Sequence, residues 1–387
     1  MTRKEFIKMC GILGIGIPLQ ASLKSCSDNS GSTDFEGKVI VIGAGAAGLA
    51  AGYFLQQQGI DYEIVEASSV YGGRMKRDTS FADFPIPLGA EWLHVGTDVF
   101  AEIVNDSSVN IDVTTIGYDQ ENDVGLFEGE ELSPAEMGFT IDRKFVNSTW
   151  FDFFEEYIVP SVQSKIRFNT AIQNIDYSDD TIRITTADGE ITANKVIMTA
   201  PLKILQLGLI NFMPALPNDK QEAIDNATVW DGFKAFIEFS EKFYETFTGF
   251  TITPEDAGQK LYYDAAYGQD SDKNILGLFS VGTGASPYLS LSDDELRDQM
   301  LSELDEIYDG KASASYVKHI SQNWNNEPFI QGAYLYDNED WQRVQKLAES
   351  VDDKIFFAGA AYGFSDDWSS VHTSAQAAKR AVEEIVG

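Results

Sequence analysis

Short apolar runs separated by glycine-containing turns dominate the chain after residue 37. Residues 39–42 (VIVI) form a continuous apolar run that ends at Gly43, the pattern of a strand buried on both faces of a parallel sheet. Residues 46–58 then predict a helix, and residues 62–65 (YEIV) predict a second strand. We therefore expect residues 39–66 to form one strand-helix-strand unit with parallel strands.

Later stretches repeat this pattern. Residues 181–193 alternate apolar and polar positions around Asp188-Gly189, which predicts a β-hairpin. Residues 196–201 and 355–359 predict two more buried strands, and we expect a final helix from about Ser374 to Ile385. These pieces are expected to complete the lobe that the first unit begins.

The segments between these strands are rich in aromatic side chains, and we assign them to a discontinuous second domain. Within it, Ser292 and Glu295 have the spacing of a capping box, which predicts a helix that ends near Gly310. The alternation of residues 230–239 around Lys234 predicts a strand.

Length and composition favour two lobes. The chain has 387 residues, of which 43% are hydrophobic and 12% aromatic, enough to bury a substantial core. We therefore expect an α/β fold in which a Rossmann-like domain, with a parallel sheet and a β-hairpin or meander, joins a discontinuous α+β domain. The first domain comprises residues 38–96, 161–202 and 346–387, and the second comprises 97–160 and 203–345.

The charged residues exclude some classes of partner. Lys and Arg number 28 against 61 Asp and Glu, a formal charge of −33. Such a charge repels phosphate backbones and anionic membrane surfaces, so we expect no nucleic-acid partner. The only cysteines are Cys10 and Cys26, so the body of the chain has no disulfide, no Cys nucleophile and no Cys-rich metal site, and we expect no metal centre.

The first 26 residues differ from the rest. Three basic residues precede an apolar run at residues 9–19 that is too short to span a bilayer. Residues 2–8 resemble a twin-arginine export signal with Lys in the second arginine place, and residues 23–26 (LKSC) resemble a bacterial lipobox. An ordinary secretory signal, or a soluble protein, is the alternative.

We therefore expect residues 1–26 to be a leader and residues 27–37, which are small and polar, to be a flexible linker. We expect an exported protein that is either periplasmic or a membrane-anchored lipoprotein. Its only contact with the membrane would then be a lipid anchor on Cys26.

A glycine pattern follows the first predicted strand. Gly43, Gly45 and Gly48 (GAGAAG) open the predicted helix, which is the context of a dinucleotide-binding turn. In such a turn the helix N-terminus favours the charge of a pyrophosphate. Glu66 ends the second strand and can accept hydrogen bonds from a ribose hydroxyl. This unit predicts a bound dinucleotide but does not separate FAD from NAD.

The next segments favour FAD over NAD. Tyr71-Gly72-Gly73-Arg74 resembles the Gly-Gly-Arg segment of the flavin-containing amine oxidase family, which includes monoamine and polyamine oxidases. Residues 88–94 (LGAEWLH) are similar to that family's segment beside the flavin ring. The resemblance implies FAD as the cofactor, with Arg74 as the countercharge of its pyrophosphate.

The resemblance continues in the second domain. Lys234 matches the family's lysine that holds a water against flavin N5, although a lone lysine in this pattern could also lie on the surface of an edge strand. Tyr334 matches one wall of the family's aromatic cage. Ala333 stands where monoamine oxidases carry their flavin-tethering cysteine, so FAD is expected to be non-covalent.

Residues 356–359 (FFAG) are similar to the family's closing segment, but Ala360 replaces its Glu and residues 371–374 (VHTS) replace its small-residue turn. These departures leave the ribityl contact and the second cage wall open, with Trp368 or Tyr362 as candidates for the wall.

The expected site has two parts. The resemblance implies catalytic roles for Lys234, Tyr334 and His94, with His94 as a polar contact or proton acceptor. Contacts to FAD are expected from Gly43, Gly45, Ala46, Ala47, Gly48, Glu66, Ala67, Gly72, Gly73, Arg74, Gly89, Ala90, Glu91, Trp92, Gly359, Ala360, Ser370 and Val371.

The activity implied is oxidation of a primary amine or polyamine, with O2 or another electron acceptor such as a quinone or cytochrome reoxidising the flavin. Alternatives are an L-amino-acid oxidase, a desaturase or isomerase of the same superfamily, and a non-catalytic FAD-binding protein. An amino-acid oxidase needs a basic partner for the substrate carboxylate, whereas a desaturase has no need for Lys234 or the cage.

Overall fold

The computed structural model describes residues 35–387 except 120–122, 137–139, 252–257, 337–338 and 365–366. The expected leader at residues 1–26 and most of the linker at residues 27–37 lie outside the described residues. Among the helices of the described part, none is both long and apolar enough to cross a membrane.

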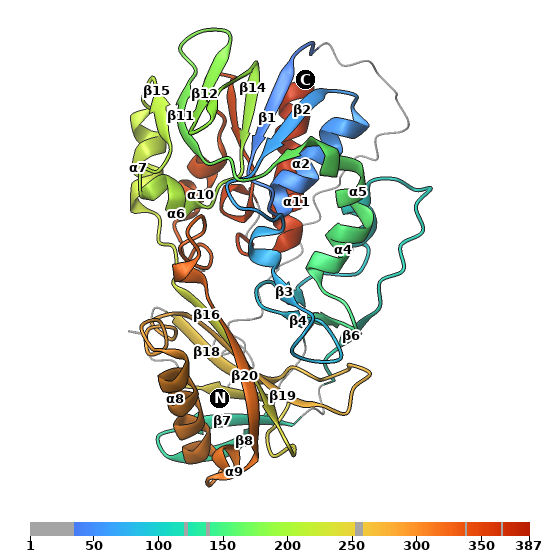
Figure 1. Ribbon diagram of the computed structural model, residues 1–387, viewed down its shortest axis with the longest axis vertical. Helices are drawn as coiled ribbons and strands as arrows, with labels where there is room; N and C mark the ends of the chain where they lie inside the picture. The colour runs from blue at the N-terminus through green and yellow to red at the C-terminus, as the bar shows by residue number, and fades with distance from the viewer. Residues whose placement is uncertain (1–34, 120–122, 137–139, 252–257, 337–338, 365–366) are drawn as a thin grey trace.

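A five-stranded parallel sheet forms the centre of the upper lobe (Figure 1). Its order is β10 (Ile166–Arg167), β2 (Asp61–Val65), β1 (Lys38–Ile42), β14 (Lys195–Met198) and β21 (Ile355–Phe357). Helix α2 (Ala46–Gln57) connects β1 to β2 and packs against the last helix, α11 (Val371–Val386). The predicted strands and Rossmann-like unit are confirmed, and α11 begins three residues before the predicted Ser374.

The predicted hairpin is also present, but it belongs to a separate sheet. This sheet has the order β13 (Gly189–Ala193), β12 (Ile182–Thr186), β11 (Ile172–Asp176) and β15 (Asn211–Met213). Its apolar side chains, such as Ile175 and Ile184, share one core with Ile40 and Val196 of the parallel sheet. The two sheets of the upper lobe are therefore packed face to face.

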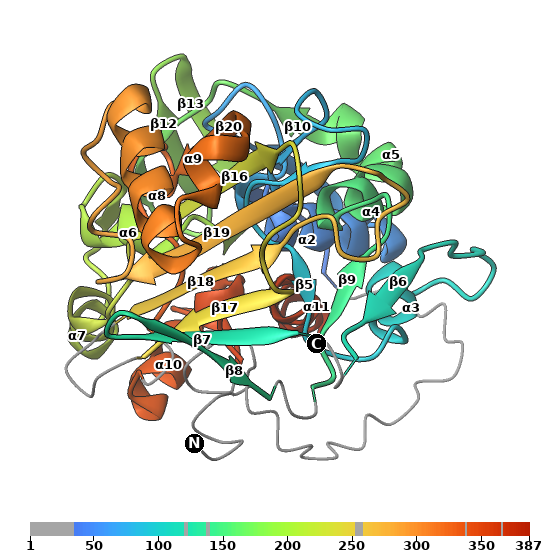
Figure 2. The same ribbon diagram turned by 90° about the horizontal axis from the view of Figure 1, so that it is seen from below.

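A seven-stranded sheet dominates the lower lobe, as Figure 2 shows from below. Its order is β20 (Tyr316–Asn323), β16 (Gly232–Phe239), β19 (Asn274–Gly282), β18 (Gly258–Asp264), β17 (Phe247–Phe250), β7 (Val124–Glu128) and β8 (Glu131–Ala135). β16 is thus an interior strand, and Lys234 on it is buried, so the reading of Lys234 as a surface residue on an edge strand is wrong.

Helices α8 (Asp293–Ile307) and α9 (Lys311–Ser315) pack on one face of this sheet. The predicted capping box begins α8, since the Glu295 carboxylate accepts a hydrogen bond from the Ser292 backbone N–H. The helix ends at Ile307, close to the predicted end at Gly310.

The remaining elements connect the lobes. Two small sheets pair β3 (Arg77–Asp78) with β4 (Ile86–Pro87), and β9 (Arg143–Phe145) with both β5 (Trp92–Leu93) and β6 (Thr115–Gly117). The other helices are α3 (Val99–Val104), α4 (Trp150–Tyr157), α5 (Val159–Val162), α6 (Leu202–Gln206), α7 (Asn218–Asn226) and α10 (Trp341–Ala348), with short 3-10 turns at Gly73–Met75, Gln163–Lys165, Trp324–Asn326 and Ala360–Tyr362.

Several segments that we assigned to the second domain pack with the first. Trp150, Phe153 and Phe154 of α4, together with Phe100 of α3, lie in one core with helices α2 and α11. Helices α6, α7 and α10 pack beneath the parallel sheet in the second core. The boundaries drawn at 97–160 and 203–345 are therefore wrong in these parts, because aromatic content shows that a helix is buried but not which sheet covers it.

Candidate active site at the junction of the two lobes

Two glycine turns face each other at the start of α2. The Gly72 N–H donates to the Ala44 carbonyl at 2.8 Å, and Gly45 and Gly72 form an isolated parallel bridge. Gly43 has a φ of 103°, in the region that favours glycine. A Cβ on Gly48 would lie 1.8 Å from the Gly43 carbonyl oxygen, so only glycine lets the helix start this close to the strand. The two turns together form a backbone cradle.

Glu66 holds the first turn in shape. Its Oε2 accepts from the Ala44 backbone N–H at 2.6 Å, and its Oε1 accepts from the Ser68 N–H at 2.8 Å. Glu66 also lines the cavity described below, and its expected contact with a ribose stays a prediction. The same carboxylate therefore both shapes the turn and borders the cavity.

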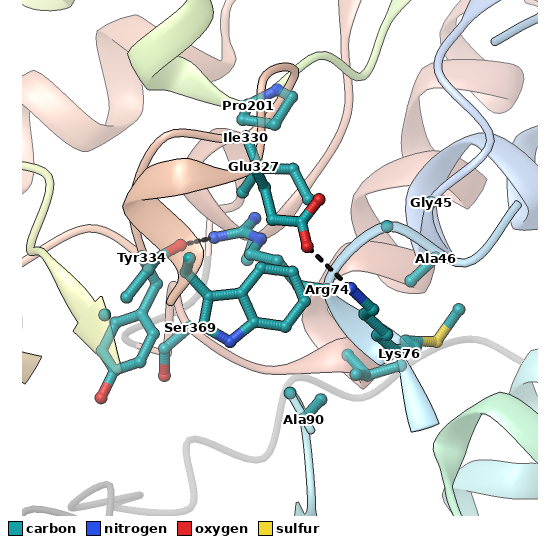
Figure 3. A pocket seen from close by; sticks show the side chains of 18 of the residues that line it. Gly45, Ala46, Arg74, Lys76, Ala90, Pro201, Glu327, Ile330, Tyr334 and Ser369 are labelled. Atoms are coloured by element: carbon teal, nitrogen blue, oxygen red, sulfur yellow. Dashed lines mark hydrogen bonds and ion pairs between the residues drawn. The ribbon is translucent and has the colours of Figure 1, made fainter. Parts of the chain in front are cut away.

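Arg74 is a partly buried cation beside this cradle. Its guanidinium donates to the Ala333 carbonyl (Figure 3), and burial lowers its pKa, opposed by Tyr362. Among the described residues no carboxylate forms an ion pair with it. Because a buried charge is costly unless it is paired, this guanidinium fits an anionic ligand group such as a pyrophosphate.

A cavity of about 1900 Å³ runs from this cradle between the lobes. It is larger than the roughly 300–1000 Å³ of a pocket for one drug-sized ligand, so it has room for a dinucleotide and a substrate. Figure 3 shows Gly45, Ala46, Arg74 and Tyr334 around it, from segments far apart in sequence. Every residue of the expected site lines the cavity except Gly48, which lies behind the turn.

Lys234 is held by three acceptors. Its Nζ donates to Glu91 Oε2 at 2.7 Å, to the Pro87 carbonyl at 2.9 Å and to the Gly89 carbonyl at 3.1 Å. Both partners of the ion pair are almost fully buried, with 4% and 1% of their side chains exposed. Burial lowers the pKa of Lys234, and Glu91 opposes that shift. The family role of Lys234, holding a water at flavin N5, stays a prediction.

His94 forms a pair with a buried carboxylate. His94 Nδ1 lies 2.9 Å from Asp142 Oδ1, and Asp142 is 3% exposed. Since an ionised carboxylate only accepts, Nδ1 carries the proton, and Nε2 is the basic nitrogen of the neutral ring. His94 lines the cavity, and its expected role as a polar contact or proton acceptor stays a prediction.

Aromatic side chains form the walls of the cavity. Tyr334 lies against Trp230, with ring centroids 5.9 Å apart, and Trp368 also lines the cavity. Tyr362 is buried elsewhere and donates to the Ala200 carbonyl at 2.9 Å, so of the two candidates for the second wall it is Trp368 that reaches the cavity. The sequence predicts Trp368 as a candidate wall but does not place Trp230 at the site.

The N-terminus of α11 forms the far end of the cavity. Ser370 lines the cavity, yet its buried Oγ has no hydrogen-bond partner within the described part of the chain. His372 Nδ1, two residues on, is likewise buried without a partner there. Because Ser370 lines the cavity, a polar ligand group at this helix end would satisfy its Oγ. Ala360 also lines the cavity, as does Asp367, whose carboxylate accepts a hydrogen bond from the Ser370 N–H at 3.2 Å.

His372 gives the fold a measurable pH dependence. Burial lowers its pKa from 6.5 to about 4, opposed by Asp367. Between these values the unfolded chain binds a proton that the folded protein does not, so the free energy of unfolding should fall by about 2 kcal/mol from about pH 7 to about pH 5. We expect the His372→Asn variant to lose this pH dependence of the free energy of unfolding, measured by urea unfolding. His319→Asn, which removes a histidine of the lower lobe, should keep it.

The residues fit FAD. The cradle at α2, the unpaired Arg74 and the polar end at α11 suit a pyrophosphate, its countercharge and the polar end of a flavin, in that order along the cavity. No group of three His, Cys, Asp or Glu side chains in the described ranges could hold a metal ion. Sequence reasoning missed Asp142 and Lys144, which no motif marks.

Comparison with known proteins agrees with this arrangement. The family model described as flavin containing amine oxidoreductase matches residues 151–386, more than half of the chain, and the NAD(P)-binding Rossmann-like domain matches residues 41–106. Polyamine oxidase 4 of Oryza sativa subsp. japonica is 24% identical over 89% of this chain and 88% of its own length.

Lysine-specific histone demethylase 2 of Homo sapiens is 24% identical over 93% of this chain. The chain spans only 54% of that relative's length, and 25% of the length of the mouse lysine-specific histone demethylase 1B.

Two solved structures share the fold at low identity. Putrescine oxidase bound to putrescine superposes with a TM-score of 0.73 at 13% identity, over 91% of this chain and 99% of that one. Cyclohexylamine oxidase from Brevibacterium oxydans gives 0.74 at 14% identity over the same shares of the two chains. With the family model covering most of the chain and the cavity built for a flavin dinucleotide, the protein belongs to the flavin containing amine oxidoreductase family and uses FAD as its cofactor.

Proposed function

We propose that the protein oxidises the C–N bond of a primary amine or polyamine. FAD, when bound, accepts the hydride from the carbon next to the nitrogen. The nitrogen loses a proton, the resulting imine is hydrolysed by water to an aldehyde and ammonia or a shorter amine, and O2 takes up two electrons and two protons to give H2O2.

The pairing of the cationic side chains supports an amine substrate over an amino acid. Lys76, Arg77 and Lys234 line the cavity, and each already pairs with a carboxylate: Glu327, Glu155 and Glu91 respectively. The fourth cation of the lining, Arg74, lies at the glycine cradle. An amino-acid oxidase needs a cation for the substrate carboxylate, and the described lining offers none beyond these four.

The chain's own residues bind, orient and deprotonate the substrate. Trp230, Tyr334 and Trp368 supply apolar walls that exclude water and leave room for a flat or aliphatic amine. His94 takes the proton of the substrate ammonium at Nε2, because only the neutral amine has the lone pair that assists loss of a hydride. Asp142 keeps His94 in the tautomer that can do so.

Asp142→Asn tests this role of His94. An Asn amide can donate to Nδ1 and so stabilise the tautomer with the proton on Nε2, which removes the acceptor. We expect kcat/KM near neutral pH to fall about 10-fold to 100-fold, with the acidic limb of the pH profile moved to higher pH, while the rate at high pH recovers because the amine is then already neutral. An equal loss at every pH would assign Asp142 a purely structural role.

Matched substrate pairs test the substrate class. Each pair consists of an alkylamine or arylalkylamine and the amino acid that carries the same side chain, and H2O2 release by the FAD-loaded enzyme is measured. A kcat/KM about 100-fold or more higher for the amine supports the proposal, because the lining offers no cation to pair with the carboxylate of the amino acid. A preference for the amino acid would instead identify the protein as an amino-acid oxidase.

A desaturase or isomerase of the same superfamily would turn over neither member of such pairs and would need no proton acceptor at His94. The pair of His94 with the buried carboxylate of Asp142 favours the amine reaction over it.

We also propose that the protein is exported and anchored through Cys26, on the lipobox-like residues 23–26. Expression of the full chain in a bacterium that processes lipoproteins should give a form that partitions into detergent. Cys26→Ala should move it to the aqueous phase with its flavin still bound. A wild-type protein found only in the aqueous phase contradicts the anchor.

A further inference from the structure

Three charged side chains form one buried cluster at the cavity wall. Glu91 lies between Lys234 on β16 and Lys144 on β9, with Oε2 2.7 Å from Lys234 Nζ and Oε1 3.5 Å from Lys144 Nζ. Both lysine side chains are 4% exposed and the Glu91 side chain is 1% exposed. The Tyr263 hydroxyl also donates to Glu91 Oε2, at 2.5 Å. All three side chains are therefore largely shielded from bulk solvent.

The two lysines do different work in this cluster. Lys234 lines the cavity, and all three of its N–H donors are used on Glu91 and two carbonyls. Lys144 does not line the cavity; its Nζ instead lies 3.4 Å from the Asp264 carbonyl and also donates to the Ala265 carbonyl. Lys144 thus approaches Glu91 from the side away from the cavity.

The cluster carries an excess of positive charge. Burial alone would raise the pKa of Glu91, but the two ammonium groups outweigh burial and hold that pKa below its usual value, so Glu91 is ionised. The carboxylate of Asp264, the other acid near Lys144, is paired with Lys242 at 2.6 Å. One anion between two cations leaves a net charge of one positive unit, whereas Glu91 with Lys234 alone would be neutral.

We propose that Lys144 is an electrostatic positioning residue of the flavin site: Glu91 fixes Lys234 at the cavity wall, and Lys144 restores the positive charge that this pairing would cancel. The wall then favours the negative charge that FAD gains on reduction and raises its reduction potential. This inference rests on the proposed function only in that FAD occupies the cavity.

The competing explanation is structural. Lys144 joins β9 to the turn after β18 through the Ala265 carbonyl, and such a tie could stabilise the lower lobe without any effect on the cofactor. The two explanations differ in one quantity. A structural tie changes the free energy of unfolding, whereas an electrostatic residue changes the reduction potential of bound FAD.

The experiment measures the two-electron reduction potential of FAD in the purified holoenzyme by dye-linked photoreduction. Lys144→Met and Lys144→Gln should both lower it, so that the ratio of reduced to oxidised FAD at a fixed poise falls about tenfold, or about 30 mV. Lys144→Gln keeps a donor for Glu91 and Ala265 and guards against loss of folding. Lys144→Arg, which keeps the charge, should stay near the wild type.

Lys260→Met is the matched control, since Lys260 is a partly buried lysine of β18 that pairs with Glu303 at 2.7 Å and does not line the cavity. It should leave the potential unchanged. If Lys144→Gln binds FAD with the wild-type potential, the inference is overturned while the proposed function stands. If the wild-type protein binds no FAD, both fall together.

Discussion

Gly48→Ala should release FAD and destabilise the protein. The new Cβ would lie 1.8 Å from the Gly43 carbonyl oxygen and 3.1 Å from Thr199 Oγ1, and the first of these is backbone that cannot rotate away. Helix α2 must then move from β1, which opens the cradle where the pyrophosphate lies. We expect a loss of about 3 kcal/mol in the free energy of unfolding and FAD binding at least about tenfold weaker, measured by urea unfolding and by flavin fluorescence.

Gly117→Ala is the control for this substitution. A Cβ at Gly117, in β6, meets only the Arg143 guanidinium at 3.4 Å, which is ordinary contact with a flexible group. That variant should keep FAD affinity and lose little stability. If Gly48→Ala bound FAD as tightly as Gly117→Ala, the cradle would not be the dinucleotide site.

Lys234→Met should slow the half-reactions of the flavin by about 100-fold. Met has nearly the volume of the lysine stem but removes the ammonium that donates to Glu91, Pro87 and Gly89, so the segment beside the expected flavin ring loses its anchor. A preorganised charge at a dry site is worth roughly 10²–10³ in rate. Stopped-flow absorbance of the flavin, anaerobic for reduction and with O2 for reoxidation, separates the two steps.

The same substitution at Lys260 provides the comparison, because it too removes an ion-paired lysine from the seven-stranded sheet. Lys260→Met should reduce and reoxidise at wild-type rates. Equal rates for Lys234→Met and the wild type would remove Lys234 from the reaction, whatever its place in the cavity.

Local patterns predicted the parts of the fold that local interactions decide. The apolar run at residues 39–42, the glycines after it and the strand that ends before Glu66 specify one strand-helix-strand unit within a single stretch of chain, and the structure has it. The site residues that follow known motifs likewise meet in one cavity, because the motifs sit at the ends of strands that the sheets bring together.

The partners of those residues could not be predicted in the same way. Lys144 faces Glu91 because β9 pairs with β5 in a register that sets Trp92 opposite Lys144, and strands of two or three residues leave no periodic pattern. Asp142, two residues before it, meets His94 through the same pairing. Tyr263 reaches Glu91 across 172 residues of sequence. Such contacts depend on tertiary packing, which a single sequence does not display.

The domain boundaries failed for a related reason. The aromatic stripe of α4 was visible, but Phe153 and Phe154 are equally compatible with either lobe until α2 and α11 are placed. The sequence therefore predicted that these aromatic side chains are buried, but not which lobe buries them.

The most direct test of the central claim is anaerobic mixing of the FAD-loaded protein with monoamines, polyamines and amino acids while the flavin absorbance is followed. The account predicts a yellow protein whose absorbance bleaches with one group of amines and not with the amino acids. Bound flavin that no amine reduces, or that only amino acids reduce, would contradict it.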